Sequence, residues 1–420
     1  MDLERNWAGN YTYGAIRMHR PDTLEGVQQA VIGTRKLRVL GSRHSFNGLA
    51  DSAGDHLSLT QLDRVVTLDR ERRTVTVEGG VRYGWLAEYL HRAGYALPNL
   101  ASLPHISIAG ACATATHGSG DRNGVLGTSV AGLELVLADG TLLELSREQP
   151  AFDGAVVGLG GLGVVTKTTL DIVPTFAMRQ EVYDDLPLAE LEANFETIVS
   201  SAYSVSLFTD WQAAVFNQVW LKRRAEDGNA HASAPDFFTA VRATTPRHPI
   251  AALSAENCTT QLGIPGPWHE RLPHFRMNFT PSSGAELQSE YFVPREHAVA
   301  ALRAIAELRE PIAPLLLISE VRTIAADNLW MSPCYRQACV AFHFTWRPDW
   351  SAVQRVLPLI EARLAPFSVR PHWGKLFTLA PAQVRAHYPR LPDFQELLRT
   401  YDPQGKFRNP FLDTYVFGPS

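Results

Sequence analysis

The sequence contains little cysteine, no long apolar run and no concentration of charge of one sign. Only four cysteines occur in 420 residues, at Cys112, Cys258, Cys334 and Cys339. No two of them have the two-residue spacing of zinc knuckles or redox pairs, and four cannot cross-link so long a chain. We therefore expect reduced, mostly buried thiols and no bound metal.

The same absences bear on membranes and nucleic acids. No apolar stretch approaches the roughly 20 residues of a membrane-spanning helix, and the first residues lack the basic and apolar regions of a secretory signal. The 39 basic and 43 acidic residues give a net charge of −4 and include no basic run, which argues against nucleic-acid binding. These features predict a cytoplasmic protein with a small ligand, and neither a membrane nor a nucleic acid as partner.

The chain is long enough for two domains, because 420 residues exceed what one hydrophobic core usually serves. In the first part, apolar periodicity and turn residues predict alternating helices and strands. The Asp139-Gly140 pair predicts a hairpin turn, since it readily accepts positive φ. The expected helices are 23–32 and 83–92, and the expected strands are 37–40, 64–68, 74–77, 133–137 and 142–145.

The composition changes near Pro174, where a strand predicted over 164–173 ends and a long segment rich in proline and aromatic residues begins. We place a domain boundary there. A helix over 294–310 and strands over 315–322 and 340–346 predict a second domain of α+β type.

The last part of the chain has helical patterns at 382–388 and 394–401, followed by an aromatic tail. We expect this segment to pack on the first domain. The predicted units are therefore 1–174, 175–377 and 378–420.

Two motifs that often indicate a cofactor or a metal have the wrong context. Gly158–Gly163 fits GxGxxG, but the β-branched residues at 164–170 predict a strand, not the helix whose N-terminus binds pyrophosphate in NAD sites. His269 and His274 lie five residues apart with Pro273 between them, so they cannot share one helix face as zinc ligands. An ordered loop, with His274 toward the substrate side at most, is the preferred interpretation.

Two glycine-rich stretches are better candidates for ligand binding. The loop 39–47 follows a strand and offers consecutive backbone N–H groups that can surround a pyrophosphate, although a lone histidine such as His44 is more often structural. The stretch 98–120 has almost no bulky side chains after Ala109, so its backbone approaches either another backbone or a ligand. Two such stretches favour a long ligand.

Polar pairs alternate with apolar residues in the strands of the second domain. Period-2 alternation places Glu320 with Arg322 on one face of their strand, and His343 with Thr345 on one face of the next. A solvated face with an exposed ion pair is the simpler alternative. Lys375 weakens that alternative, because aromatic residues and a glycine flank it in 370–377.

Taken together, segments 39–47, 98–120, 160–167 and 372–375 resemble the vanillyl-alcohol oxidase superfamily of FAD enzymes. Segments 258–275, 320–322 and 343–346 are similar to the alditol oxidases within it, and the likeness runs nearly end to end. The resemblance implies an α+β, two-domain fold of vanillyl-alcohol oxidase type. Its parts would be an FAD-binding domain over 1–174, a substrate-binding cap domain over 175–377 and a C-terminal segment over 378–420.

The resemblance also implies FAD bound covalently through His44. The same matching gives the other cofactor contacts as Val39, Leu40, Gly41, Ser42, Arg43, Ser45, Ser102, Ser107, Gly110, Thr114, Ala115, Thr116 and His117. Arg43 stands where family loops often have glycine. The substrate pocket would be lined by Ser102, Glu320, Arg322, His343, Thr345 and Lys375.

The implied reaction oxidises the C1 alcohol of an alditol such as xylitol or sorbitol to the aldose, by hydride transfer to flavin N5, while O2 becomes H2O2. We assign Arg322 and Lys375 to stabilising a developing alkoxide, and His343 to accepting the proton. Glu320, with Ser102 and Thr345, would recognise hydroxyl groups and orient the cations, so Glu320 counts with Arg322, His343 and Lys375 among the expected catalytic residues. An aldonolactone oxidase or dehydrogenase of the same superfamily and a non-catalytic sugar-binding relative are the alternatives. A monomer with a small polyol and O2 as partners is expected.

Overall fold

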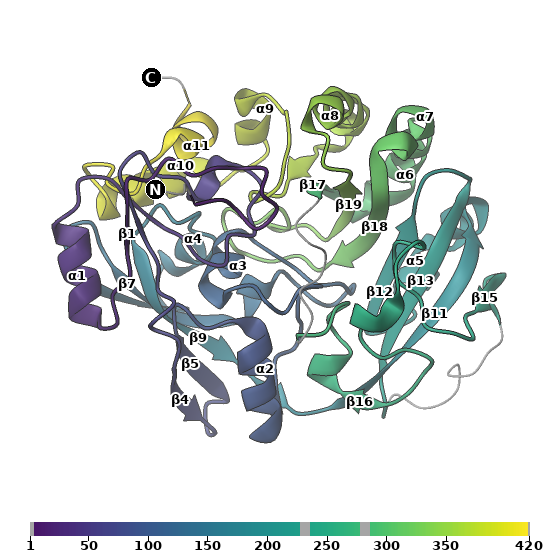
Figure 1. Cartoon of the computed structure of the whole chain (residues 1–420), viewed down its shortest axis with the longest axis horizontal. Helices are drawn as coiled ribbons and strands as arrows, with labels where there is room; N and C mark the ends of the chain where they lie inside the picture. Colours follow the sequence, from purple (N-terminus) through teal and green to yellow (C-terminus); the bar gives the residue numbers. More distant parts are fainter. Residues whose placement is uncertain (1–3, 227–235, 278–285, 419–420) are drawn as a thin grey trace.

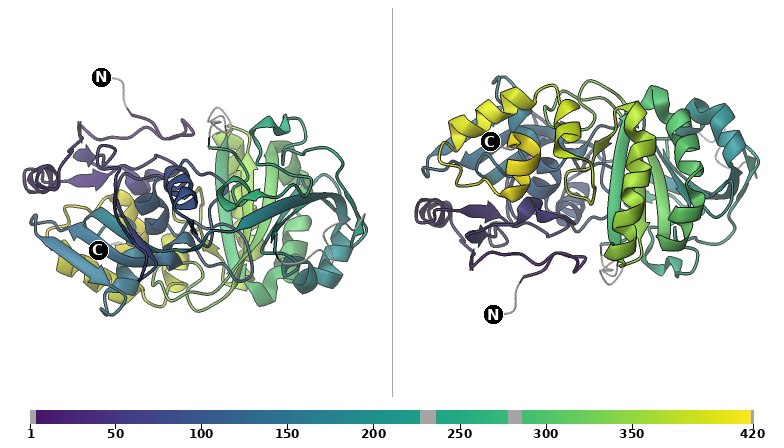
Figure 2. Two further views of the ribbon diagram at one scale, coloured as in Figure 1. Left: turned by 90° about the horizontal axis from the view of Figure 1, so that it is seen from below. Right: turned by 90° about the horizontal axis from the view of Figure 1, so that it is seen from above.

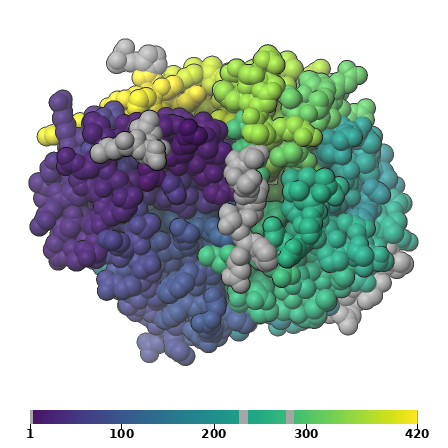
Figure 3. Space-filling view, in the orientation of Figure 1, coloured from purple at the N-terminus to yellow at the C-terminus, as the bar shows by residue number. Residues whose placement is uncertain are grey.

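A computed structural model describes residues 4–226, 236–277 and 286–418 of the chain. Figure 1 shows two lobes side by side, the first built mainly from the N-terminal part of the chain and the second around one large sheet. In the space-filling view of Figure 3, the purple and blue first lobe meets the green second lobe along the middle of the molecule. Among the described residues, no helix has the length and apolar character to span a bilayer.

The first lobe contains a parallel sheet and an antiparallel sheet. The parallel sheet has the order β1 (Arg17–His19), β3 (Asp55–Leu57), β2 (Leu37–Val39). The antiparallel sheet has the order β4 (Val65–Asp69), β5 (Thr74–Glu78), β9 (Val164–Asp171), β7 (Val130–Val136), β8 (Leu142–Ser146).

The predicted local structure of this lobe is confirmed at several points. The helix α1 (Leu24–Ile32) begins after Thr23, whose side chain accepts a hydrogen bond from Gly26 N, and α2 spans Tyr83–Arg92. The predicted hairpin pairs Val136 with Leu142. After the GxGxxG segment the chain forms strand β9 rather than a helix, so the reason for setting aside a NAD site is also confirmed.

The second lobe is organised by a ten-stranded sheet. Its long antiparallel strands, in spatial order, are β11 (Ala177–Pro187), β13 (Val215–Arg224), β12 (Ser204–Thr209), β18 (Leu316–Ile324), β19 (Cys339–Trp346) and β17 (Leu287–Pro294). Short strands complete its edges: β14 (Asp236–Phe237), β15 (Ala240–Arg242), β16 (Gly266–Pro267) and β20 (Arg370–Pro371).

Helices cover one face of this sheet. Figure 2 shows α5 (Leu188–Val199), α6 (Ala298–Ala306) and α8 (Trp350–Leu364) along that face. The opposite face carries Glu320 and Arg322 and forms part of a pocket between the lobes. The apolar alternate positions of β18 and β19, among them Val321, Phe342 and Phe344, are almost completely buried.

The helix predicted over 294–310 is wrong in extent. Strand β17 continues to Pro294, which pairs with Cys339, and the helical part is split into α6 and α7 (Arg309–Ile312). Pro311 has no amide hydrogen to donate to the carbonyl of Glu307, and its ring would clash with that carbonyl in a continuous helix. The chain therefore leaves helical geometry at Leu308, where φ is −97° and ψ is 18°.

The C-terminal segment returns to the first lobe. It contains α9 (Pro381–Ala386), α10 (Leu391–Tyr401) and α11 (Pro410–Leu412). Asn409 Nδ2 donates to the carbonyl of Gly48 at 3.0 Å, and Lys36 Nζ donates to the carbonyl of Gly405 at 2.6 Å. Figure 1 shows this yellow segment above the first lobe.

Candidate active site

A cavity of about 800 Å³ lies between the lobes. Its walls come from both lobes, so neither lobe could form it alone. The first lobe contributes the loop after β2 and the stretch around α3 (Ile108–Ala113), and the second lobe contributes the polar face of β17, β18 and β19. Residues 372–375 close it from the side of β20.

Backbone and small side chains bring the two glycine-rich stretches of the first lobe together. Ser107 N donates to Ser42 Oγ at 3.1 Å. A Cβ added at Gly41 would lie 2.7 Å from Ser107 Oγ, and one added at Gly110 would lie 2.8 Å from it. A larger residue at either position would therefore require the Ser107 hydroxyl to move, and both glycines line the cavity.

Arg43 adopts a backbone conformation that favours glycine, with φ of 62°. Contacts from the N-terminal segment hold it there: Arg43 Nη1 is 2.7 Å from Glu4 Oε2, and Trp7 N donates to the carbonyl of Arg43 at 2.8 Å. A non-glycine residue is therefore accommodated at this left-handed position of the loop, where its side chain and its carbonyl both have partners.

His44 follows directly and lines the cavity. Its ring stacks on Trp7 with centroids 5.2 Å apart and planes 20° apart. Burial lowers the pKa of His44 to about 4 despite the opposing influence of the Ser42 backbone. Within the described residues its buried Nδ1 makes no hydrogen bond. A neutral imidazole whose buried Nδ1 has no hydrogen-bond partner among the described residues thus lines the cavity.

The most charged part of the cavity surrounds Glu290, a residue that sequence reasoning missed. Arg322 Nη2 donates to Glu290 Oε1 at 2.8 Å and Lys375 Nζ donates to Glu290 Oε2 at 2.6 Å. His117 Nε2 lies 3.1 Å from Glu290 Oε1. Burial would raise the pKa of Glu290, but Lys375, His117 and Arg322 outweigh it and hold that pKa well below the usual range.

Strand register explains why these groups meet. Glu290 in β17 is paired with His343 in β19, and His343 is also paired with Glu320 in β18. The three side chains therefore form a row across adjacent strands on one face of the sheet. The available signal for Glu290 was an acidic residue directly before the apolar residues Tyr291, Phe292 and Val293.

Lys375 and His343 are arranged as donor and acceptor. Lys375 Nζ lies 2.8 Å from His343 Nδ1, and His343 Nε2 lies 3.0 Å from Thr345 Oγ1. Burial, followed by Lys375, keeps the pKa of His343 well below its ordinary value. Because a neutral imidazole has one acceptor nitrogen, Nδ1 accepts from Lys375 and Nε2–H donates to Thr345.

Glu320 and Arg322 are not on a solvated face, so the simpler alternative of an exposed ion pair is wrong. Glu320 is 4% exposed and Arg322 is 6% exposed. Glu320 Oε1 is 2.7 Å from His274 Nε2, and Arg322 Nη1 donates to Ser102 Oγ at 3.3 Å. Arg322 Nε is 3.5 Å from Glu320 Oε2 and makes no hydrogen bond of normal geometry within the described residues.

The structure places nearly all the predicted site residues around this cavity. The cavity lining includes Val39, Leu40, Gly41, Ser42, Arg43, His44, Ser45, Ser102, Ser107, Gly110, Thr114, Thr116, His117, Glu320, Arg322, His343, Thr345 and Lys375. Ala115 does not line it; this residue is completely buried and has φ of 55°. All four cysteines are buried and unpaired, as expected.

Comparison with known proteins gives this geometry a family. Residues 20–146 match the FAD binding domain family, and residues 283–415 match the D-arabinono-1,4-lactone oxidase family. The chain is 51% identical to an alditol oxidase from a Streptomyces species over 416 residues, which cover 98% of this chain and 99% of the relative. The chain belongs to the alditol oxidase family.

Other relatives of this alditol oxidase family member are more distant. It is 26% identical to L-gulonolactone oxidase of Mus musculus, covering 98% of each chain, and 28% identical to L-gulono-1,4-lactone dehydrogenase of Mycobacterium tuberculosis, covering 99% of each. A solved cholesterol oxidase from B. sterolicum superposes with a TM-score of 0.77 at 16% identity, covering 99% of this chain and 96% of the other. The predicted fold class, with an FAD-binding domain and a second domain of mixed helix and sheet, is confirmed.

The residues of this alditol oxidase family member fit FAD. Gly41 and Gly110 keep backbone accessible at the cavity wall, and the loop 39–45 supplies N–H groups of the kind that bind pyrophosphate. The unpartnered His44 Nδ1 lies on the same wall. A long cofactor along both stretches would leave the Glu290 and Glu320 region for a smaller molecule.

Proposed function

We propose that this protein is an FAD-dependent alditol oxidase that converts a terminal CH2OH group of xylitol, sorbitol or a similar polyol to the aldehyde. Each turnover removes two electrons and two protons from the alcohol and delivers them to O2 as H2O2. The observation that carries the proposal is the buried row Glu290–His343–Glu320, flanked by Arg322 and Lys375, in the cavity that the His44 loop also lines. Such a row offers hydrogen-bond donors and acceptors suited to several hydroxyl groups.

A covalent bond between His44 and FAD is part of the proposal. Two observations support it: the imidazole is neutral because burial lowers its pKa, and Nδ1 has no hydrogen-bond partner within the described residues. Trp7 stacks on the ring and limits its rotation. Bound FAD would supply a two-electron acceptor for the alcohol carbon.

The chain's own residues would bind the polyol and move its proton. Within the described residues Lys375 Nζ has two hydrogen-bond partners, which leaves its third proton for a substrate oxygen. The Arg322 guanidinium is a second cation that lines the cavity. Two cations beside the reacting hydroxyl would stabilise alkoxide character and facilitate proton removal.

His343 is the proposed proton acceptor. Its Nδ1 carries the lone pair and is 2.8 Å from Lys375 Nζ. When Lys375 turns its proton toward the substrate oxygen, that lone pair becomes free to accept the hydroxyl proton. Glu320, Ser102 and Thr345 would hold the remaining hydroxyls in place.

Oxidation of a sugar lactone is the second candidate. Its support is the match of residues 283–415 to the D-arabinono-1,4-lactone oxidase family and the lactone-acting relatives at 26% and 28% identity. The higher identity to an alditol oxidase, 51%, favours the polyol. A non-catalytic sugar-binding role would not account for two cations placed beside the substrate hydroxyl.

Oxygen uptake tests the proposal directly. Purified holoprotein should consume O2 and release H2O2 with xylitol or sorbitol, and should be much slower with L-gulono-1,4-lactone. The reverse preference would select the lactone reaction, and no flavin reduction by either class would select sugar binding without catalysis. Acid precipitation tests the bond to His44: a yellow pellet is expected, whereas a colourless pellet under a yellow supernatant contradicts it.

A further inference from the structure

Behind Glu320, away from the other charged groups of the cavity, lies a buried lysine that makes no salt bridge to a carboxylate among the described residues. Lys222 in β13 is 0% exposed. Its Nζ is 2.6 Å from the carbonyl oxygen of Leu272, 2.9 Å from that of Pro273 and 3.2 Å from His274 Nδ1. An ammonium group has three protons and no lone pair. Three acceptors around one nitrogen therefore fit the charged form and satisfy it completely.

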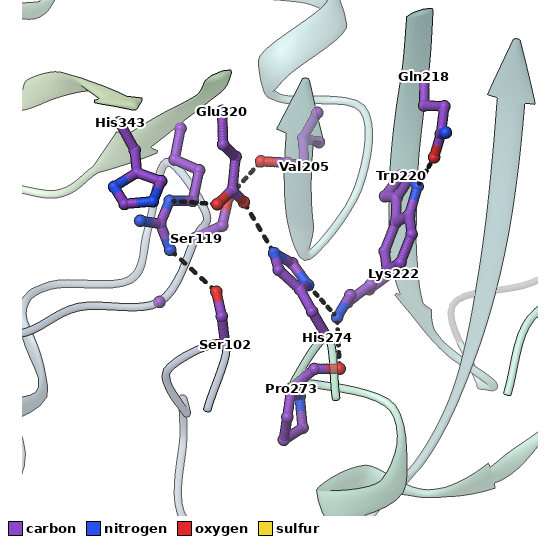
Figure 4. Close-up of polar contacts among 12 residues, drawn as sticks. Ser102, Ser119, Val205, Gln218, Trp220, Lys222, Pro273, His274, Glu320 and His343 are labelled. Atoms are coloured by element: carbon purple, nitrogen blue, oxygen red, sulfur yellow. Dashed lines mark hydrogen bonds and ion pairs between the residues drawn. The ribbon is translucent and has the colours of Figure 1, made fainter. Parts of the chain in front are cut away.

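Lys222 and Glu320 favour the same tautomer of His274, because Lys222 Nζ lies beside Nδ1 and the Glu320 carboxylate can only accept a hydrogen from Nε2. His274 is buried, and burial lowers its pKa to about 4, so the ring is neutral. Because Nδ1 accepts from Lys222, Nε2 carries the hydrogen and donates to Glu320 Oε1 at 2.7 Å. Figure 4 shows the three side chains in line, from Lys222 through His274 to Glu320.

Packing and backbone contacts fix the ring in this orientation. The His274 ring lies edge-on to Phe208 at 5.5 Å and to Trp220 at 5.2 Å. His274 N donates to the carbonyl of Ser102 at 3.1 Å, which ties the loop to a second residue of the proposed substrate pocket. These contacts therefore hold the His274 ring in a single orientation, with the Nε2 hydrogen directed at Glu320.

We propose that Lys222 and His274 are positioning residues that hold Glu320 as an anionic acceptor for a substrate hydroxyl. The inference rests on the proposed function. In it, Glu320 binds one hydroxyl of the polyol, while Lys222 and His274 hold the Glu320 side chain in place from outside the Glu290–His343–Glu320 row. With Oε1 occupied by His274 and Oε2 3.5 Å from Arg322 Nε, Glu320 keeps lone pairs on Oε2 for the ligand. Without Lys222, the buried Nδ1 would lose its donor, and the ring that donates to Glu320 Oε1 would lose one of the contacts that hold it in place.

The test is a double-mutant cycle on the holoenzyme, with the variants Lys222→Met, His274→Leu and their combination. Flavin reduction by xylitol is followed anaerobically by rapid mixing, which separates the apparent Kd of xylitol from the limiting rate. Burial lowers the pKa of Lys222 to about 7, so the measurements are made near pH 6, where the ammonium form predominates.

Each single variant should raise the apparent Kd of xylitol about tenfold or more, the size of a hydrogen bond to a charged group, with a smaller change in the limiting rate. The double variant should be no weaker than the worse single variant, because both act through the same hydrogen bond to Glu320. Multiplying effects, or wild-type Kd values in the singles, would overturn the proposal. His274→Gln should recover most of the affinity, since an amide supplies one acceptor and one donor.

Lys36→Met is the matched control, because Lys36 also donates to a backbone carbonyl and lies outside the cavity; it should bind xylitol as the wild type does. A measurement on the wild-type holoenzyme tests the proposal even if a variant does not fold. In nitrogen-15 NMR, the His274 imidazole is identified as the signal that is absent in His274→Gln. We expect its hydrogen on Nε2 and none on Nδ1. A hydrogen on Nδ1 would contradict the proposed roles of Lys222 and His274. If wild-type flavin is not reduced by any polyol, the proposed function fails while the NMR result still decides the tautomer.

Discussion

Replacing Glu290 with glutamine should shift the pH dependence of flavin reduction toward acid. The substitution keeps the shape of the side chain and removes the charge that Arg322 and Lys375 share. Burial lowers the pKa of Lys375, and Glu290 is the main group that opposes this, with a smaller contribution from Glu320. Without the carboxylate, the ammonium group of Lys375 loses its proton at a lower pH.

The size of the shift follows from one contact. Lys375 Nζ and Glu290 Oε2 are 2.6 Å apart, and Glu290 is 1% exposed. A hydrogen bond to a charged group contributes about 1.5–3 kcal/mol, and one pKa unit corresponds to about 1.4 kcal/mol. The protonated form of Lys375 should therefore lose about 1.5–3 kcal/mol of stabilisation, so the pKa of Lys375 should fall. The protonated amine of Lys375 is the proposed active form. As pH is raised, the rate of flavin reduction should therefore begin to fall at a lower pH in Glu290→Gln than in the wild type.

The assay is the limiting rate of anaerobic flavin reduction by xylitol, measured across pH in wild type and Glu290→Gln. Glu181→Gln is the matched control, because Glu181 is also 1% exposed, is paired with Arg223 at 2.6 Å and lies outside the cavity. It should cost stability without moving the basic limb of the profile. An unchanged basic limb in Glu290→Gln would refute the role of Glu290 in keeping Lys375 protonated.

Further outcomes follow from the same structure. His44→Ala should give a colourless pellet after acid precipitation, and Trp7→Ala should lower the covalently bound fraction of flavin because the stacked ring (5.2 Å) is released; an unchanged yellow pellet in His44→Ala would disprove the linkage. Gly41→Ala should weaken FAD retention, measured by flavin absorbance per protein, since its Cβ would lie 2.7 Å from Ser107 Oγ, and adding Ser107→Ala should restore part of it. The folded-state pKa of Glu320 is lowered, chiefly because Arg322 and His274 outweigh burial, so its stabilisation should be complete above the unfolded pKa of about 4.5 and diminish as pH falls below it; a Tm difference between Glu320→Gln and wild type that is independent of acid pH would contradict this.

Local sequence patterns predicted much of the fold and one side of the site. Tyr83–Arg92 forms a helix with the predicted ends, and the alternation in 316–324 and 339–346 placed Glu320 with Arg322 and His343 with Thr345. Period-2 reasoning works there because residues two apart in a strand share a face whatever the neighbouring strand is. The helix over 294–310 failed because Pro294 and Pro311 were interpreted as its two ends. The structure instead uses Pro294 as the last residue of a strand.

What alternation could not provide was which strands are neighbours. Glu290, His343 and Glu320 form one row only because β19 lies between β17 and β18. The contacts to Glu290 also come from His117 and Lys375, which are distant in sequence from each other and from β17. No local pattern encodes this register, so a buried glutamate with several cationic partners was missed, and the support of Glu320 by Lys222 was missed for the same reason.

The two buried carboxylates of the cavity are held in opposite ways, which separates their tasks. Both oxygens of Glu290 are occupied, by Arg322 and His117 on one and Lys375 on the other, so this residue organises cations and has little capacity for a ligand. Glu320 has one oxygen bound to a neutral histidine and the other 3.5 Å from Arg322 Nε. A substrate hydroxyl can therefore donate to Glu320 without displacing an existing hydrogen bond, whereas donating to Glu290 would require breaking one to a cation. For this reason loss of the Glu290 charge should alter the pH dependence of the chemical step, and loss of the Glu320 charge should mainly weaken polyol binding.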